Sequence, residues 1–267
     1  MAKKKSALRK GIVITFVNEK GGVGKTTCCF NVAWEMANQG KKILMIDMDG
    51  QTANLTFFCG VDKTDEMKTV TNVLLKPEIV EKVILNIRDG LDLLPSDIEA
   101  SSINPSVHRV SALRKAIRAV ADQYDYIFMD VNPSPNWGQT ISLAASDYVI
   151  MPMLPDVTSL AADTGTMESI KVIREEQHEE LKVLGVVFVK FTTQTNLSKD
   201  VHASAQKLAK MMGGKVFTST IRQAVVMSEC VSNHEGITDY APNSKVADEI
   251  RNLAKEIEKE VVRREHQ

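Results

Sequence analysis

Short apolar runs alternate with longer amphipathic stretches along the chain. Most of these runs are continuously apolar, which is typical of strands that are covered on both faces of a sheet. They predict strands at residues 12–17, 43–48, 91–94, 126–129, 148–151 and 183–189, with a weaker one at 216–217.

The stretches between the runs carry apolar residues at helical spacing. They predict helices at residues 26–39, 111–123, 159–177, 197–212 and 244–264. Strands that alternate with helices favour right-handed crossovers and a parallel sheet. The sequence therefore predicts an α/β fold of three layers, in which helices cover both faces of a mainly parallel, twisted sheet. Residues 54–86 fit the pattern least, and we expect short helices there that cover one sheet edge.

Composition adds limits to this picture. The chain has 267 residues, a net charge of -1, 43% hydrophobic and 25% charged residues, which excludes a fibrous or disordered protein. No linker divides it, so we expect residues 11–267 to form one domain and residues 1–10 to form a flexible basic arm. With no signal peptide and no apolar run of about 20 residues, the chain reads as a cytoplasmic protein without a membrane partner. Cysteines 28, 29, 59 and 230 have no metal-site spacing and are expected to be buried thiols.

One glycine-rich segment carries a strong chemical signal. Ile12–Thr27 reads IVITFVNEKGGVGKTT, in which an apolar strand enters a turn that opens directly into a helix. Gly21, Gly22 and Gly24 lack a Cβ, so the backbone can curl and point its N–H groups at an anion. The positive end of the helix dipole adds to this attraction. The segment predicts a phosphate-binding loop.

The residues after the glycines suit a nucleoside triphosphate with Mg²⁺. Lys25 supplies a positive charge to the β- and γ-phosphates, the Thr26 hydroxyl can bind Mg²⁺, and Thr27 can bind a neighbouring phosphate oxygen. The strict loop pattern is not met, because Glu19 replaces its first glycine, and a second lysine, Lys20, stands at the mouth of the loop. The residues predicted to hold the nucleotide are Lys20, Gly21, Gly22, Val23, Gly24, Lys25, Thr26 and Thr27.

Acidic residues follow two of the predicted strands. Asp47 and Asp49 end the strand that begins at Ile43, and Asp130 ends the strand that begins at Tyr126. Ligands bind at this carboxyl edge of open α/β sheets, where an aspartate can support Mg²⁺ or orient an attacking water.

The segment KGGVGKTT resembles the deviant Walker A motif of the ParA/MinD family of P-loop ATPases. The segment around Asp47 and Asp49 resembles that family's D-x-D-P-Q motif, with Gly50 in place of proline. The resemblance implies that ATP lies between two subunits, with Lys20 reaching the partner's nucleotide and making the dimer ATP-dependent. It also implies that Asp49 positions the hydrolytic water, that Asp47 supports the metal site, and that Asp130 is the Walker B carboxylate. Lys20, Lys25 and Asp49 are thus the predicted catalytic residues, and Thr26, Asp47 and Asp130 the predicted metal-site residues.

The C-terminal part favours the ParA branch. Thr220–Glu229 and the segment from Gly236 to Ser244 resemble ParA proteins, and by this likeness Ile221, Arg222 and Gln223 lie near the adenine. The resemblance implies a partition ATPase that dimerises with ATP, binds DNA non-specifically, and is stimulated by a ParB-like partner. The ATP-bound form would then be associated with the nucleoid.

Non-specific DNA binding needs a basic face. Val226 and Asn196 stand where relatives often carry a basic residue, so DNA binding is expected to be weak or to depend on other residues. The candidates are Lys190, Lys199, Lys207, Lys210, Lys215, Arg222, Lys245 and Arg251.

The alternative is a membrane-surface positioning ATPase of the Min type, which needs an amphipathic C-terminal helix. Ile250, Leu253, Ile257 and Val261 do share one helical face, but glutamates are interspersed among them. We therefore expect this helix to pack on its own domain.

Overall fold

The computed structural model describes residues 10–62, 64, 66–97, 107–133, 137–191 and 197–266, without the side chains of 107, 157–163 and 197–199. The predicted arm, apart from residue 10, lies outside these residues.

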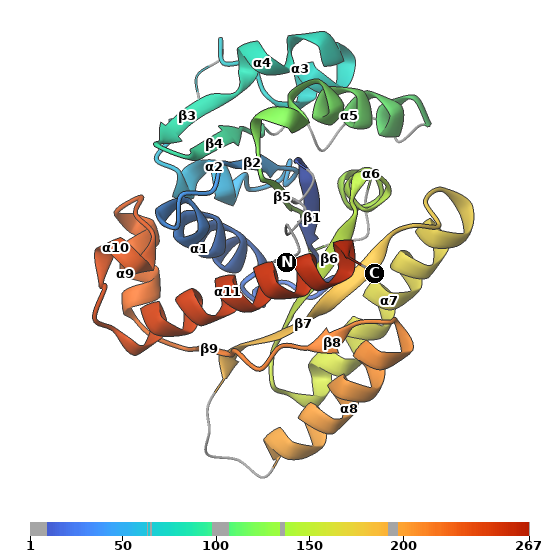
Figure 1. Cartoon of the computed structure of the whole chain (residues 1–267), viewed down its shortest axis with the longest axis vertical. Coiled ribbons are helices and arrows are strands. Elements are labelled where there is room, and N and C mark those ends of the chain that lie inside the picture. Colours follow the sequence, from blue (N-terminus) through green and yellow to red (C-terminus); the bar gives the residue numbers. More distant parts are fainter. Residues whose placement is uncertain are drawn as a thin grey trace, which may run out of the picture.

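A sheet of nine strands, counted over the described residues, runs through the centre of the molecule (Figure 1). The strands are β1 Ile12–Phe16, β2 Ile43–Asp47, β3 Leu85–Arg88, β4 Leu91–Leu94, β5 Tyr126–Asp130, β6 Tyr148–Met153, β7 Lys182–Phe191, β8 Lys215–Val216 and β9 Ile221–Arg222. Their order is β3-β4-β2-β5-β1-β6-β7-β8, and β9 pairs with β7. Every pairing is parallel except that of β3 with β4.

Helices cover both faces of this sheet. The longer ones are α1 Lys25–Asn38, α5 Val107–Val120, α6 Trp137–Ala145, α7 Val157–Glu176, α8 Leu197–Met211 and α11 Lys245–Glu265. The shorter ones are α2 Asn54–Phe58, α3 Val70–Leu75, α4 Val80–Val83, α9 Val226–Ser232, α10 Ile237–Tyr240 and the 3₁₀ turns Pro77–Ile79 and Ala121–Gln123.

Successive residues of each strand point to opposite faces of the sheet, and their side chains pack into two separate cores. Val13 and Ile127 face one core, which α3 to α8 complete. Ile14 and Phe128 face the other, which α1, α2 and α9 to α11 complete. Because both faces of β1, β2, β5 and β6 are buried, nearly every residue of these four strands is apolar. The predicted three-layer α/β fold is confirmed.

The region of residues 54–86 does contain short helices, as predicted, but it also contains a strand. β3 pairs antiparallel with β4, joined by a turn in which Gly90 has a φ of 75°. The sequence pattern does not predict β3, because its residues, LNIR, alternate between apolar and polar and form no continuous apolar run.

The C-terminal helix packs on its own chain, as predicted. Ile250, Leu253, Ile257 and Val261 of α11 are fully buried, and α11 lies against α1. Within the described part of the chain, no helix has an apolar stretch long enough to cross a bilayer. The four cysteines are buried free thiols, also as predicted.

Candidate functional site

The loop between β1 and α1 has the backbone shape that its glycines predict. Gly22 and Gly24 have φ values of 72° and 84°, in the left-handed region that favours glycine. Gly24 is the N-cap of α1, no side chain caps this end, and no acidic residue lies in its first turn. The first N–H groups of α1 are therefore available to an anion.

Polar contacts with neighbouring segments fix the position of the loop, and no sequence pattern predicts them. The Asn18 side-chain amide donates to the Pro152 carbonyl at 2.8 Å, while its oxygen accepts from Lys20 N, also at 2.8 Å. The Glu19 carboxylate accepts from the Ser169 hydroxyl at 2.7 Å. The residue that breaks the strict loop pattern thus anchors the loop to α7.

Lys25 is the buried cation of the loop. Its Nζ donates to the Lys20 carbonyl at 3.1 Å. Burial lowers the pKa of Lys25, and the nearby carboxylates of Asp130 and Asp49 partly oppose that shift. An anion beside Lys25 would stabilise the charged amine, which is what a phosphate group does.

Asp130 is a buried carboxylate at the end of β5. Neither of its oxygens has a hydrogen-bond partner among the residues that the structure describes. Burial and the charge of Asp47 raise its pKa well above the usual value, against the effect of the Thr26 hydroxyl and Lys25. A bare buried carboxylate next to a hydroxyl fits Mg²⁺, which is usually held by one or two protein oxygens together with substrate phosphates. The described residues contain no group of three or more His, Cys, Asp or Glu that could hold a metal without such phosphates.

Asp47 lies opposite Asp130 across the β2–β5 pair, but its oxygens are bound by its own chain. They accept from Asp49 N at 3.0 Å and from the N–H and hydroxyl of Thr56 at 2.8 and 2.7 Å. Burial raises the pKa of Asp47 to about 6, although these hydrogen bonds oppose the shift. This geometry suits a carboxylate that holds the start of α2 and supports the metal site indirectly.

Asp49 is 5% exposed and lines the cavity described below. Its carboxylate accepts from Gln51 N at 2.9 Å, Thr52 N at 3.2 Å and the Thr52 hydroxyl at 2.5 Å. The Asn132 amide also donates to it, at 3.3 Å. Thr52 and Asn132 were missed in the sequence. Asn132 could have been found from strand alternation, since it follows Asp130 by two residues.

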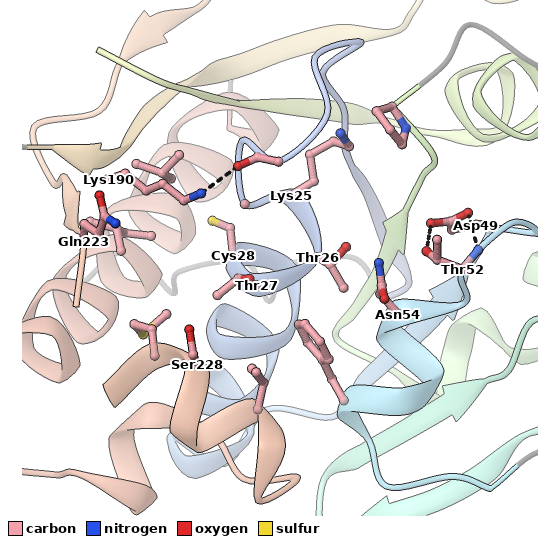
Figure 2. A pocket seen from close by; sticks show the side chains of 18 of the residues that line it. Lys25, Thr26, Thr27, Cys28, Asp49, Thr52, Asn54, Lys190, Gln223 and Ser228 are labelled. Carbon is pink, nitrogen blue, oxygen red and sulfur yellow. Dashed lines mark hydrogen bonds between the residues drawn. The ribbon is translucent and has the colours of Figure 1, made fainter. Parts of the chain in front are cut away.

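Lys25 and Asp49 line a cavity of about 710 Å³, whereas Asp47 and Asp130 are fully buried and do not line it. Lys25 and Thr26 lie at its centre, Asp49, Thr52 and Asn54 lie on one side, and Lys190 and Gln223 lie on the other (Figure 2). The loop glycines Gly22 and Gly24, together with Thr27, also line it. So do all three residues predicted to lie near an adenine, Ile221, Arg222 and Gln223.

The structure places two lysines, Lys20 and Lys190, relative to this cavity. Lys20 does not line this cavity, and its Nζ pairs with Asp156 at 3.2 Å. Lys190, a candidate for DNA binding, lines the cavity instead and donates from Nζ to the Gly22 carbonyl at 2.9 Å. Lys190 directly follows the apolar run of β7 at residues 183–189, and nothing in that run predicts its place at the cavity.

The remaining DNA-binding candidates spread over several elements, and some are neutralised. Arg222 pairs with Glu249 at 2.6 Å, and Arg251 pairs with Asp248 at 2.8 Å. Lys215 pairs with Glu256 at 3.0 Å. Lys207 and Lys210 are exposed on α8, and Lys245 is exposed at the start of α11. The side chain of Lys199 lies outside the described residues.

Comparisons with known proteins show what the chain as a whole is similar to. A family model described as an AAA domain matches residues 11–183. The sporulation initiation inhibitor protein Soj of Bacillus subtilis is 29% identical over 252 residues, covering 92% of this chain and 98% of that protein. The chromosome partitioning protein ParA of Caulobacter vibrioides is 28% identical, with 92% and 93% covered. Among solved structures, an ATP complex of a McdA variant from Cyanothece superposes with a TM-score of 0.80 at 17% identity, covering 95% of this chain and 97% of that one.

Proposed function

The chain belongs to the ParA/MinD family of P-loop ATPases as a ParA-like member, and on that basis we propose that it hydrolyses ATP within a two-fold dimer. In this proposal the ATP cycle drives the segregation or positioning of a DNA molecule. The observation that carries the proposal is the bare, buried carboxylate of Asp130 beside Thr26 and Lys25, at a helix end whose N–H groups are uncapped.

Different residues of the chain bind the phosphates, support the metal ion, orient the water and receive the adenine. The N–H groups of the loop and the Lys25 amine bind the phosphates and stabilise the charge that develops on them. Thr26 and Asp130 would hold Mg²⁺, with Asp47 behind them, and the ion would neutralise charge on the β- and γ-phosphate oxygens. Asp49 orients the attacking water. The loop of Ile221, Arg222 and Gln223 receives the adenine.

Calorimetry tests the nucleotide site directly. Wild-type protein is expected to bind ATP with Mg²⁺, and Lys25→Ala is expected to weaken binding by about tenfold to a hundredfold, the effect of a lost charge-assisted contact. Lys259→Ala, which removes an exposed lysine of α11, is the matched control and should bind as the wild type does. Absence of Mg²⁺-dependent ATP binding by the wild type would refute the proposal.

The finer parts of the proposal concern partners. Lys20 lies outside its own cavity, which supports a role at the nucleotide of a second copy. Exposed lysines on α8 and α11 support non-specific DNA binding in the ATP-bound state, and a ParB-like protein would stimulate a slow basal hydrolysis. A Min-type membrane role receives no support from α11, because its apolar face is buried in the core.

A further inference from the structure

The two carboxylate oxygens of Asp49 have different partners. Oδ1 accepts from Gln51 N, Thr52 N and the Asn132 amide, at 2.9, 3.2 and 3.3 Å. Oδ2 accepts from the Thr52 hydroxyl at 2.5 Å. The donors on Oδ1 come from two backbone positions and a buried side chain, so Oδ1 alone fixes the orientation of the carboxylate.

The Thr52 hydroxyl therefore adds little orientation but occupies the second oxygen. A carboxylate that orients a water for attack must accept a hydrogen bond from that water. Thr52 is exposed and lines the same cavity as Asp49 (Figure 2). Its hydroxyl takes one of the two lone-pair sites of Oδ2, and so competes with the water for the better-placed site on that oxygen.

We propose that Thr52 is a built-in brake on ATP hydrolysis, which acts by occupying Oδ2 of Asp49. The inference rests on the proposed function, in which Asp49 positions the water. Thr52 is a positioning residue here, because it acts only through the carboxylate of Asp49.

The backbone around Thr52 supports a specialised arrangement. Ala53, which follows it, has φ 47° and ψ 46°, a left-handed conformation that is unfavourable for a residue with a side chain. Its N–H donates to the Asp49 carbonyl at 3.0 Å, which closes the turn. Such strain persists where the surrounding structure requires it, often at functional positions.

Steady-state ATP turnover of full-length variants tests the brake. Thr52→Val removes the hydroxyl at nearly constant shape and is expected to raise kcat about fivefold with KM for ATP unchanged, the effect of about one hydrogen bond. Thr52→Ser keeps the hydroxyl and is expected to retain the slow wild-type rate. Thr218→Val, at an exposed threonine outside the cavity, is the matched control and should leave kcat unchanged.

A double variant shows whether the effect passes through Asp49. In the Asp49→Asn background, Thr52→Val is expected to give no gain, since no carboxylate remains to be released. A gain that persists in that background would overturn the proposal. Thermal unfolding of each variant, and Thr52→Ala as a second truncation, separate a lost brake from a damaged fold.

The failures of the two proposals are distinguishable. If the wild type hydrolyses ATP and both folded truncations turn over at the wild-type rate or more slowly, Thr52 is no brake, while the ATPase function stands. If the wild type neither binds nor hydrolyses ATP, the proposed function is wrong, and the inference about Thr52 is wrong as well.

Discussion

Nζ of Lys20 lies 3.2 Å from Oδ1 of Asp156, and this ion pair turns the first lysine of the phosphate loop away from the cavity that the loop forms. Asp156 lies in the short connection between β6 and α7, directly before α7. The two side chains are 25% and 40% exposed, so a competing anion can reach the lysine. A lysine held in this way is ready to exchange one anionic partner for another.

This exchange gives a first prediction, on dimerisation. Lys20→Ala is expected to abolish the ATP-dependent dimer while ATP binding by the monomer persists. Asp156→Asn is expected to strengthen the dimer about twofold to fivefold, because an exposed ion pair of at most about 1 kcal/mol no longer competes for Lys20. Sedimentation velocity with and without ATP measures both effects. Lys171→Ala, at an exposed lysine of α7, is the control, and normal dimers of Lys20→Ala would contradict the cross-subunit role.

Asp130 gives a second prediction, on metal dependence. Its oxygens are buried and bare among the described residues. Mg²⁺ is expected to raise the affinity of the wild type for ATP, and Asp130→Asn is expected to reduce this gain at least about tenfold. Calorimetry in Mg²⁺ and in EDTA measures that gain. Asp122→Asn, at an exposed aspartate, should keep the full gain. An Asp130→Asn protein with an undiminished Mg²⁺ effect would remove Asp130 from the metal site.

The lysines of α8 give a third prediction, on DNA. Lys207 and Lys210 are exposed there, and the described residues place no acidic group in an ion pair with them. The double variant Lys207→Ala/Lys210→Ala is expected to weaken duplex binding and to lower the salt slope by about two units. Fluorescence anisotropy with ATP, in a hydrolysis-blocked Asp49→Ala background, measures both.

Arg251→Ala serves as the comparison in that experiment. Its guanidinium already pairs with Asp248 and donates to the Thr238 carbonyl, so its loss is expected to change DNA affinity less. An unchanged salt slope in the α8 double variant would place the DNA surface elsewhere.

A fourth prediction concerns acid stability. Glu260 of α11 is 4% exposed and accepts from Arg263 at 2.6 Å and Arg264 at 2.8 Å. Burial alone would raise the pKa of Glu260, but these hydrogen bonds and the charge of Lys215 lower it to about 2. Because the folded-state pKa lies below the usual 4.5, the network contributes stability above that pH and loses it as the pH falls towards 2.

Glu260→Gln is therefore expected to lower the free energy of unfolding at neutral pH by about 1 to 2 kcal/mol. This value is kept small because solvent screens the partly exposed arginines. The loss should shrink between about pH 4.5 and 2. Urea titrations at several pH values measure it, and Glu175→Gln, at an exposed glutamate of α7, should show neither effect. A constant difference at every pH would mean that packing, rather than charge, explains the loss.

The phosphate loop and the fold class could be predicted from the sequence because their determinants are local. A continuous apolar run specifies a strand buried on both faces, and Gly22 and Gly24 supply the left-handed backbone that the turn requires. Ile221, Arg222 and Gln223 were placed at the cavity by resemblance, and they line it. β3 and β9 were not predicted, because their sequences, LNIR and IR, contain no continuous apolar run.

Tertiary contacts decided the state of each charged group. Asp47 and Asp130 look alike in the sequence, as carboxylates that end apolar strands, yet Thr56 satisfies one while the other stays bare. Lys190 looked like a surface lysine, but the pairing of β7 with β9 brings it to the cavity that Lys25 and Gln223 also line. The local pattern sets the backbone shape within a segment. Burial and ion pairing depend on which distant segments fold beside it, and only the packed structure determines that.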